Sequence, residues 1–447
     1  MITPDSIINT LAGNGNPNPF PPPPPTNGDG GPALNAIFNV IPAAVFDAAG
    51  NLLVAEMSGN RVRRIAPDGT VTTIAGTGNR GYSGDGGPAV KADITSPYGL
   101  TVDPQGSVYI AGADSRVRRI EPDGTIHLVA GTGTGTGLIR SQGDGGPAVN
   151  ATLNEPKGVA VDAAGNVYIA DTSNARLRVV DRNGIIRTVA GPGTLGSDYW
   201  NGVAIDPSGR LYVSITHTGT SLWSIVERVN GDGSLTPVAG NADPQACGGG
   251  VLEFTADGQP ATSVPLCLIL SLSFDSHGNL YIPESRYGAV LRVTPDGAIS
   301  RIAGSSQANL FSGDGGPPLQ ASLAAPQYYS PAGVAVDSAG NMFIPQSGAN
   351  RIREVTGTPL TLKLDPQPGK PQTIAVTTNF GEPFPYLVRT NGAWLSTNRT
   401  SGVTGESFQV ITDSTALASG TYRGTVTVIL AVPIPIQADL PVTLTVP

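Results

Sequence analysis

The chain has 447 residues, of which 59 are Gly, 40 are Pro and only 13% are charged. An average globular domain has about 25% charged residues, so this composition argues against a helical bundle or a coiled coil. The net charge of −8 argues against binding to nucleic-acid phosphates, which needs clustered Lys and Arg. No run approaches the ~20 apolar residues of a membrane span. Residues 1–11 show no signal peptide, so the chain is either cytosolic or has lost a signal.

The first predicted strand covers residues 7–12 and is followed by Gly13. It stands alone at the start of the chain. Its Ala-Gly ending is the ending of the fourth strand in the repeats that come after it. This isolated strand therefore needs a partner elsewhere in the chain.

Six copies of one pattern follow. Each copy has an apolar strand that ends in Asp, then two residues, then Gly and a second strand; the Asp positions are Asp47, Asp103, Asp162, Asp206, Asp275 and Asp337. A polar loop and a third strand come next, with Arg at alternate positions in several copies. A tight Asp-Gly or Asn-Gly turn and a fourth strand complete all copies but the last. Each copy is predicted to form four antiparallel strands.

Four-stranded units repeated around an axis make a β-propeller, whose closure protects its strand edges. The sixth unit lacks a fourth strand, and residues 7–12 can supply it. We therefore predict an all-β, six-bladed propeller over residues 1–357, with the N-terminal strand completing the last blade.

One copy carries three recognisable elements: Pro156-Lys157-Gly158-Val159-Ala160-Val161-Asp162, then Gly165-Asn166-Val167-Tyr168-Ile169-Ala170-Asp171, then Asn174-Ala175-Arg176-Leu177. They resemble the NHL-repeat family, and the resemblance covers residues 1 to about 357. It implies a propeller fold. Propellers of this kind serve as protein-interaction modules, sensor ectodomains, RNA binders and a few lyases, so the resemblance alone does not define a function.

The second-to-third-strand loops and the blade-crossing loops share one face of such a propeller, and here they are the longer loops. We define this side as the loop face and predict that it binds a partner. Aromatic residues and one arginine in these loops are the candidate binding residues, with Trp200 and Arg286 expected to be the most exposed: Tyr82, Tyr98, Tyr199, Trp200, Arg286, Tyr287, Phe311, Tyr328 and Tyr329. The alternative is that these side chains fill gaps between blades.

The blade-crossing loops repeat the motif Gly-Asp-Gly-Gly-Pro-Ala, with a degenerate copy at 256–261. One carboxylate recurs in the motif, at Asp29, Asp85, Asp144 and Asp314. It either braces the loop or belongs to a Ca²⁺ site. Calcium takes six to eight oxygen ligands, so one carboxylate per motif favours the brace, and no cofactor is predicted.

An enzyme is the alternative function. Lactonase-like and lyase-like propellers hold a metal in the central channel, and the resemblance places the candidate ligands here at Glu56, Asp171 and Glu284. Asp171, Asp162 and Arg176 could also be interpreted as an acid, a base and an anion clamp. Asp and Arg positions of this kind recur in several blades, which favours hydrogen bonds or ion pairs between blades. The histidines are expected in a fourth strand, a second-to-third-strand loop and a turn of the opposite face, so they do not predict a shared zinc: His127, His217 and His277. No catalytic residue is predicted.

Cys247 and Cys267 are the only cysteines and lie in the loop that crosses from the fourth to the fifth blade. We predict a disulfide between them, which favours an oxidising compartment.

Residues 358–447 show six or seven alternating strand patterns, which fit an Ig-like β-sandwich. The segments Trp394-Leu395, Ser401-Gly402 and 419–426 resemble the BACON domain, which is common in bacterial surface and secreted proteins. The resemblance implies carbohydrate binding, although we interpret Trp394 as a core residue.

Together these features predict a secreted, cell-surface or periplasmic bacterial protein without a catalytic role. We expect it to bind a protein or a glycan at the cell exterior, without binding nucleic acid or inserting into a membrane.

Overall fold

The structure is a computed structural model of the chain. It describes residues 6–15, 28–134, 142–191, 198–218, 222–241, 243, 247, 254–305, 311–323, 331–338, 340–356, 361–365, 372–377, 385–391, 393–403, 406–413, 415, 417–430 and 436–446. Residues Ile8–Val355 form one compact unit, and residues Thr356–Pro447 belong to a second. None of the helices in these described ranges is long and apolar enough to cross a membrane.

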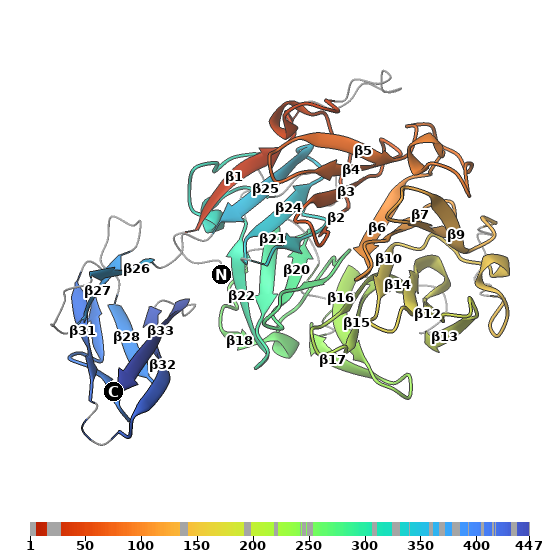
Figure 1. Ribbon diagram of the computed structural model, residues 1–447. Coiled ribbons are helices and arrows are strands. Elements are labelled where there is room, and N and C mark those ends of the chain that lie inside the picture. The colour runs from red at the N-terminus through yellow and green to blue at the C-terminus, as the bar shows by residue number, and fades with distance from the viewer. Residues whose placement is uncertain are drawn as a thin grey trace. The chain divides into compact units, whose positions relative to one another are not determined.

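The first unit is a β-propeller in which six antiparallel sheets of described strands stand around a central axis (Figure 1). The predicted all-β, six-bladed fold is confirmed. Blades 1 to 3 consist of β2 (Ala43–Phe46), β3 (Leu52–Glu56), β4 (Arg61–Ile65) and β5 (Val71–Ala75); β6 (Pro97–Val102), β7 (Val108–Gly112), β8 (Arg116–Ile120) and β9 (Ile126–Ala130); and β10 (Gly158–Val161), β11 (Val167–Asp171), β12 (Arg176–Val180) and β13 (Ile186–Ala190).

The later blades depart more from the repeat, and blade 5 has a short fifth strand. Blades 4 to 6 consist of β14 (Asp198–Ile205), β15 (Leu211–Thr218), β16 (Leu222–Val229) and β17 (Leu235–Ala239); β18 (Gln259–Pro260), β19 (Ser273–Phe274), β20 (Leu280–Glu284), β21 (Ala289–Val293) and β22 (Ala298–Ala303); and β23 (Ala335–Val336), β24 (Met342–Gln346), β25 (Arg351–Thr356) and β1 (Ile7–Ala12).

Blade 6 is assembled from both ends of the propeller sequence. Its strand order is β1-β25-β24-β23, so β1 is the outer strand. Ile8 and Ala12 are fully buried, and Ile8 exchanges backbone hydrogen bonds with the blade-crossing loop at Gly315 and Gly316. In this strand order β1 completes blade 6.

The first strands of neighbouring blades approach each other closely around the axis. A Cβ on Gly158 would lie 2.4 Å from the carbonyl oxygen of Asn201, and a Cβ on Gly99 would lie 2.3 Å from that of Lys157. Only glycine allows backbone to approach backbone at this distance. The repeated Gly in the Pro-x-Gly element therefore sets how tightly the blades converge.

The repeated Asp at the end of each first strand braces its own turn. Asp162 Oδ1 accepts the Asn166 N–H at 2.8 Å, and its Oδ2 accepts the Asn166 side-chain amide at 2.7 Å and the Tyr168 hydroxyl at 3.2 Å. The same turn recurs at Asp47 with Asn51. The expected bonds between blades are wrong for this position, because the carboxylate is used within one turn.

The blade-crossing motif lies along the outer strand of the blade that follows it. In blade 1, Gly30 N–H donates to Val71 O at 2.8 Å and Val71 N–H donates to Gly31 O at 3.0 Å. This pairing covers the outer strand edge, which would otherwise be open to other chains. Short 3₁₀ helices end five of these loops, and a sixth follows β11: η1 (Ala33–Asn35), η2 (Ala89–Lys91), η3 (Ala148–Asn150), η4 (Thr172–Asn174), η5 (Ala261–Ser263) and η6 (Pro318–Gln320).

The second unit is a sandwich of two four-stranded sheets, ordered β26-β27-β31-β29 and β30-β28-β32-β33. Tyr386 and Val428 from one sheet and Leu395 and Phe408 from the other share one buried core, and Trp394 packs against it. The strands are β26 (Thr361–Asp365), β27 (Gln372–Thr377), β28 (Pro385–Thr390), β29 (Leu395–Thr397), β30 (Ser401–Val403), β31 (Ser407–Thr412), β32 (Gly420–Leu430) and β33 (Ile436–Val446).

Candidate functional site

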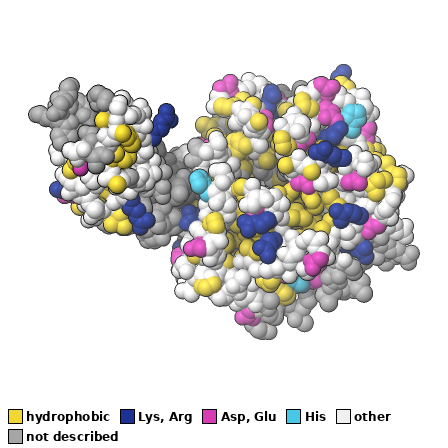
Figure 2. Space-filling view, turned by 60° about the horizontal axis from the view of Figure 1, so that its bottom comes forward, with side chains coloured by type: hydrophobic (Ala, Val, Ile, Leu, Met, Phe, Trp, Pro, Cys, Tyr) yellow, Lys and Arg dark blue, Asp and Glu magenta, His cyan; other side chains and the backbone are white. Residues whose placement is uncertain are grey.

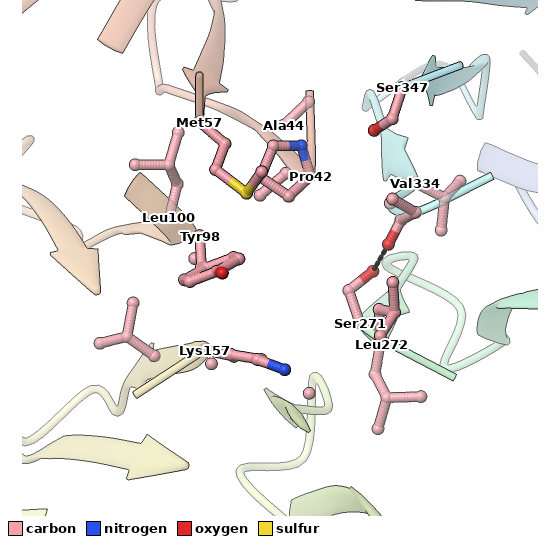
Figure 3. Close-up of a pocket in the computed structure, with 18 of the residues that line it drawn as sticks. Pro42, Ala44, Met57, Tyr98, Leu100, Lys157, Ser271, Leu272, Val334 and Ser347 are labelled. Carbon is pink, nitrogen blue, oxygen red and sulfur yellow. Dashed lines mark hydrogen bonds between the residues drawn. The ribbon is translucent and has the colours of Figure 1, made fainter. Parts of the chain in front are cut away.

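A cavity of about 270 Å³ lies in the central channel, where the first strands converge, and all six blades contribute to its wall (Figure 3). Met57 and Ser347 line it and directly follow the second strands β3 and β24. The cavity therefore lies at the end of the channel that carries the loop face. We call it the channel pocket.

The x position of the Pro-x-Gly element supplies much of the pocket wall. Tyr98 and Lys157 occupy it in blades 2 and 3, Ala332 occupies it in blade 6, and Pro42 and Leu270 stand at the matching positions of blades 1 and 5. The sequence analysis did not identify Lys157 as a site residue. The residue at this x position differs from copy to copy, whereas the residues around it repeat. This difference is the feature of the sequence that could have pointed to Lys157.

Lys157 is the cation of the pocket. Its Nζ lies 5.7 Å from the ring centroid of Tyr98 and 5.4 Å from that of Tyr199. Burial lowers the pKa of Lys157, and the negative charge of Glu155 opposes this shift. None of the ion pairs among the described residues includes Lys157. Figure 3 shows its amino group and the Tyr98 ring pointing into the cavity.

The other polar groups of the pocket are engaged by the backbone. Ser271 Oγ donates to Ala332 O at 3.1 Å, and Ser347 Oγ donates to Ile41 O at 2.9 Å. Their oxygens can still accept a hydrogen bond. The rest of the wall is mainly apolar, so the pocket combines one cation with an apolar surface.

The predicted aromatic set does not form a single cluster. Tyr98 and Tyr199 lie beside Lys157, and Tyr199 is 40% exposed. Tyr82 is also 40% exposed, but its ring stacks on Arg116 with Cζ 3.6 Å from the centroid, and Phe311 covers Arg351 at 4.1 Å. Tyr328 and Tyr329 lie outside the described residues.

Trp200 and Arg286 were expected to be the most exposed of the candidate binding residues, and neither is exposed. Trp200 is 1% exposed and belongs to the core between blades 3 and 4, because β14 begins early enough to place it inside a strand. Arg286 is half-buried and donates to Cys247 O at 3.1 Å. Tyr287 is buried, and its hydroxyl donates to Pro265 O at 3.1 Å. For Trp200 and Tyr287 the gap-filling alternative describes the structure.

The motif carboxylates pair with buried arginines of the third strands. Arg178 in blade 3 is fully buried, and its Nη2 lies 2.6 Å from Asp144 Oδ1. The same pair occurs in blades 1, 2 and 6, as Asp29 with Arg63, Asp85 with Arg118 and Asp314 with Arg353. The loop-brace interpretation fits these contacts. Each carboxylate already neutralises an arginine of a third strand, which favours the brace over the calcium alternative.

The three candidate channel ligands do not come together. Glu56, Asp171 and Glu284 are each fully buried, and none of them lines the channel pocket. Glu56 pairs with Arg63 at 3.4 Å, and Asp171 accepts the Asn154 N–H at 2.7 Å. Among the described residues, no group of three His, Cys, Asp or Glu side chains is arranged to hold a metal ion.

Burial gives these carboxyl groups unusual acidities. It raises the pKa of Glu56, which Arg63 opposes, and it raises the pKa of Asp171 to about 6 despite hydrogen bonds from Asn174 and Asn154. The pKa of Glu284 rises to about 7, although three backbone N–H groups donate to it. These shifts follow from burial within the blades.

His217 lies within a strand and was expected in a loop, because β14, β15 and β16 each run for eight residues in blade 4. Its Nδ1 is 2.6 Å from Asp198 Oδ1, and its ring stacks on Trp223 with centroids 3.8 Å apart. The predicted disulfide between Cys247 and Cys267 is present, in the segment that leads from β17 to β19.

Comparison with known proteins supports the repeat assignment. Residues 128–201 match the family model of the Teneurin NHL domain. The chain is 28% identical to human Teneurin-4 over 345 residues, which cover 68% of this chain and 12% of Teneurin-4. It is 30% identical to Teneurin-3 of Danio rerio over 332 residues, which cover 67% of this chain and 11% of that protein. The match thus spans about an eighth of the length of these relatives.

Solved structures share the fold at low sequence identity. A protein of unknown function from Bacteroides thetaiotaomicron has a TM-score of 0.53 and 18% identity, with 78% of this chain and 76% of that chain covered. An auxiliary nutrient binding protein from the same organism has a TM-score of 0.52 and 13% identity, with the same coverage. These structures share the β-propeller fold, and residues 128–201 are similar to the Teneurin NHL domain.

Proposed function

We propose that this chain is a non-catalytic recognition or scaffold protein that binds a protein or a glycan through the loop face of its propeller. The observation that carries the proposal is the ring of Tyr199, which is 40% exposed and lies on the loop face, 5.4 Å from the Lys157 Nζ that lines the channel pocket. Concave sites with a few convergent polar groups are where propellers and other scaffolds hold ligands.

The buried carboxylates support binding over catalysis. Glu56, Asp171 and Glu284, which the enzyme alternative would use, are engaged inside their own blades. The relatives support the same role: a nutrient binding protein shares the fold, and the Teneurin NHL domain shares part of the sequence.

We place the protein outside the cell, as a secreted, cell-surface or periplasmic bacterial protein. The Cys247–Cys267 disulfide supports this location, because such bonds persist in oxidising compartments. On the face drawn in Figure 2, Lys and Arg side chains lie in separate groups with Asp and Glu between them, an arrangement that does not favour nucleic acid. The second unit, as a BACON-like, Ig-like module, would add a second binding surface.

The test uses exposed residues of the loop face that lie outside the channel pocket. The full chain is screened against a glycan array and a library of extracellular proteins. We expect the double variant Tyr82→Ala, Tyr199→Ala to weaken binding of a recovered partner about tenfold or more, since exposed aromatic residues are common hot spots. The control is Gln105→Ala in a turn of the opposite face. Equal loss in both variants, or no loss in the double variant, contradicts the proposal.

A further inference from the structure

We infer that the channel pocket binds a small organic carboxylate with an apolar tail, whose carboxylate contacts Lys157 while the tail lies against the pocket wall. This inference rests on the proposed function, because the pocket opens on the proposed binding face. It adds the chemical class of a ligand and the residue that selects it.

The unpaired ammonium of Lys157 is the first reason. A cation withdrawn from water is unfavourable unless an anion or hydrogen-bond acceptors compensate it. Here the Tyr98 and Tyr199 rings compensate it only in part, at 5.7 and 5.4 Å from Nζ. The lowered pKa of Lys157 agrees with incomplete compensation. A bound carboxylate would supply the missing negative charge.

The composition of the wall is the second reason. Lys157 is one of only four lysines in the sequence and the only charged side chain that lines the pocket in the described residues. The apolar side chains come from every blade: Val40, Leu100, Val159, Val203, Leu272 and Val334. A single cation matches one singly charged group, and an apolar wall matches a hydrocarbon tail. A sugar phosphate or a polyhydroxylated sugar would need more donors than this wall offers.

The size of the pocket limits the ligand. Its volume of about 270 Å³ is just below the roughly 300–1,000 Å³ of typical small-molecule sites. The close approach of the first strands at Gly99 and Gly158 fixes this width, because no side chain can be withdrawn there to enlarge it. Short monocarboxylic acids fit this limit better than long-chain or bulky acids.

The experiment compares three probes that share one hydrocarbon chain. Calorimetry and ligand-observed NMR measure the binding of hexanoate, hexanamide and hexylamine to the full chain. We expect hexanoate to bind about tenfold or more tightly than hexanamide, since a hydrogen bond to a charged partner is worth more than a neutral one. Hexylamine should bind most weakly, because its ammonium faces that of Lys157.

The matched variants are Lys157→Met and Lys91→Met. Methionine keeps an unbranched side chain in the wall and removes the charge, while Lys91 is an exposed lysine in η2, outside the pocket. Lys157→Met should abolish the preference for hexanoate over hexanamide, and Lys91→Met should preserve it. Since Lys157 is half-buried and its pKa is lowered by burial, Lys157→Met should melt at the same temperature as the wild type or higher, and such a result excludes misfolding as the cause.

Each outcome separates this inference from the proposed function. The inference is overturned if hexanoate binds no better than hexanamide, or if Lys157→Met keeps the preference, even where a partner still binds through Tyr82 and Tyr199. If hexanoate binds through Lys157 but no partner depends on Tyr82 and Tyr199, the pocket stands as a small-molecule site and the macromolecular partner is rejected. Inorganic phosphate, tested in parallel, should not displace hexanoate at equal concentration.

Discussion

Blades 3 and 5 stabilise a buried carboxylate with different groups. Each buries a carboxylate at the end of its second strand, Asp171 in blade 3 and Glu284 in blade 5. In blade 3 the partner is Arg178, which lies 3.8 Å from Asp171 and also pairs with Asp144 of the blade-crossing loop. In blade 5 the residue at the position of Arg178 is Leu291, as the strand registers show.

Backbone groups replace the arginine in blade 5. Glu284 accepts the N–H groups of Cys267 at 3.2 Å, Leu268 at 2.7 Å and Tyr287. The disulfide ties the same segment to Cys247, and the loop carboxylate Asp257 accepts the backbone N–H of Arg301 at 2.6 Å. The comparison teaches that the repeated Arg and Asp are one of two local ways to satisfy a buried carboxylate, and not the parts of an active site.

The largest expected effect comes from removing the N-terminal strand that completes blade 6. Blade 6 carries the same Asp314–Arg353 pair as blade 3, but its outer strand β1 is supplied by the start of the chain. Deleting residues 1–13 should expose the edge of β25 and cause aggregation or a large fall in melting temperature. Size-exclusion chromatography and thermal melting check this, and an unchanged melting temperature would show that the braces hold the blade without closure.

The second effect is the loss of the blade 3 brace. Arg178→Leu copies the residue of blade 5 without its backbone donors, so Asp171 and Asp144 lose their cation. Removing one partner of a buried ion pair costs roughly 3–5 kcal/mol, and we expect a loss of this size in the free energy of unfolding, measured by chemical denaturation. The control is Arg187→Leu in the same blade, at an exposed position, where a change within about 0.5 kcal/mol is expected. Similar losses in both variants would mean that the brace has no special role.

The third effect is the pH dependence of the free energy of unfolding that Glu284 of blade 5 contributes. The pKa of Glu284 is raised from 4.5 to about 7, so between these values the folded protein binds more protons than the unfolded chain. The free energy of unfolding therefore decreases as the pH rises through this window, by up to about 3 kcal/mol from this group. Glu284→Gln should remove this part of the slope, while the contribution of Asp171 is the same in both proteins. Denaturation curves that stay parallel between pH 5 and 8 would contradict the assignment.

The sequence predicted the parts of the fold that repeat. Six Asp-x-x-Gly turns, the missing fourth strand of blade 6 and the isolated strand at residues 7–12 were enough for the propeller and its closure, since these features are local in sequence. Cys247 and Cys267 had one possible intrachain partner each. The contact of Arg178 with Asp144, 34 positions away, could not be predicted residue by residue, because it depends on how a loop folds back along a blade.

The candidate site was harder to predict because it does not repeat. Trp200 and His217 were placed wrongly, since blade 4 has longer strands than its neighbours and a repeat pattern gives no sign of such extensions. Lys157 lies within the Pro-x-Gly element of the NHL-like copy, and no role was predicted for its side chain. Its side chain became informative only when the structure showed that the x positions of different blades face one cavity.

The glycine contacts between first strands have a consequence for how such a protein can change. Because backbone meets backbone at Gly99 and Gly158, the spacing of these first strands is set by the main chain. The side chains at the x positions then vary on a fixed backbone: exchanging Lys157 or Tyr98 changes the charge and shape of the pocket wall without moving the strands that carry it. Such a scaffold can acquire a new ligand by single substitutions that leave the folding of its blades untouched.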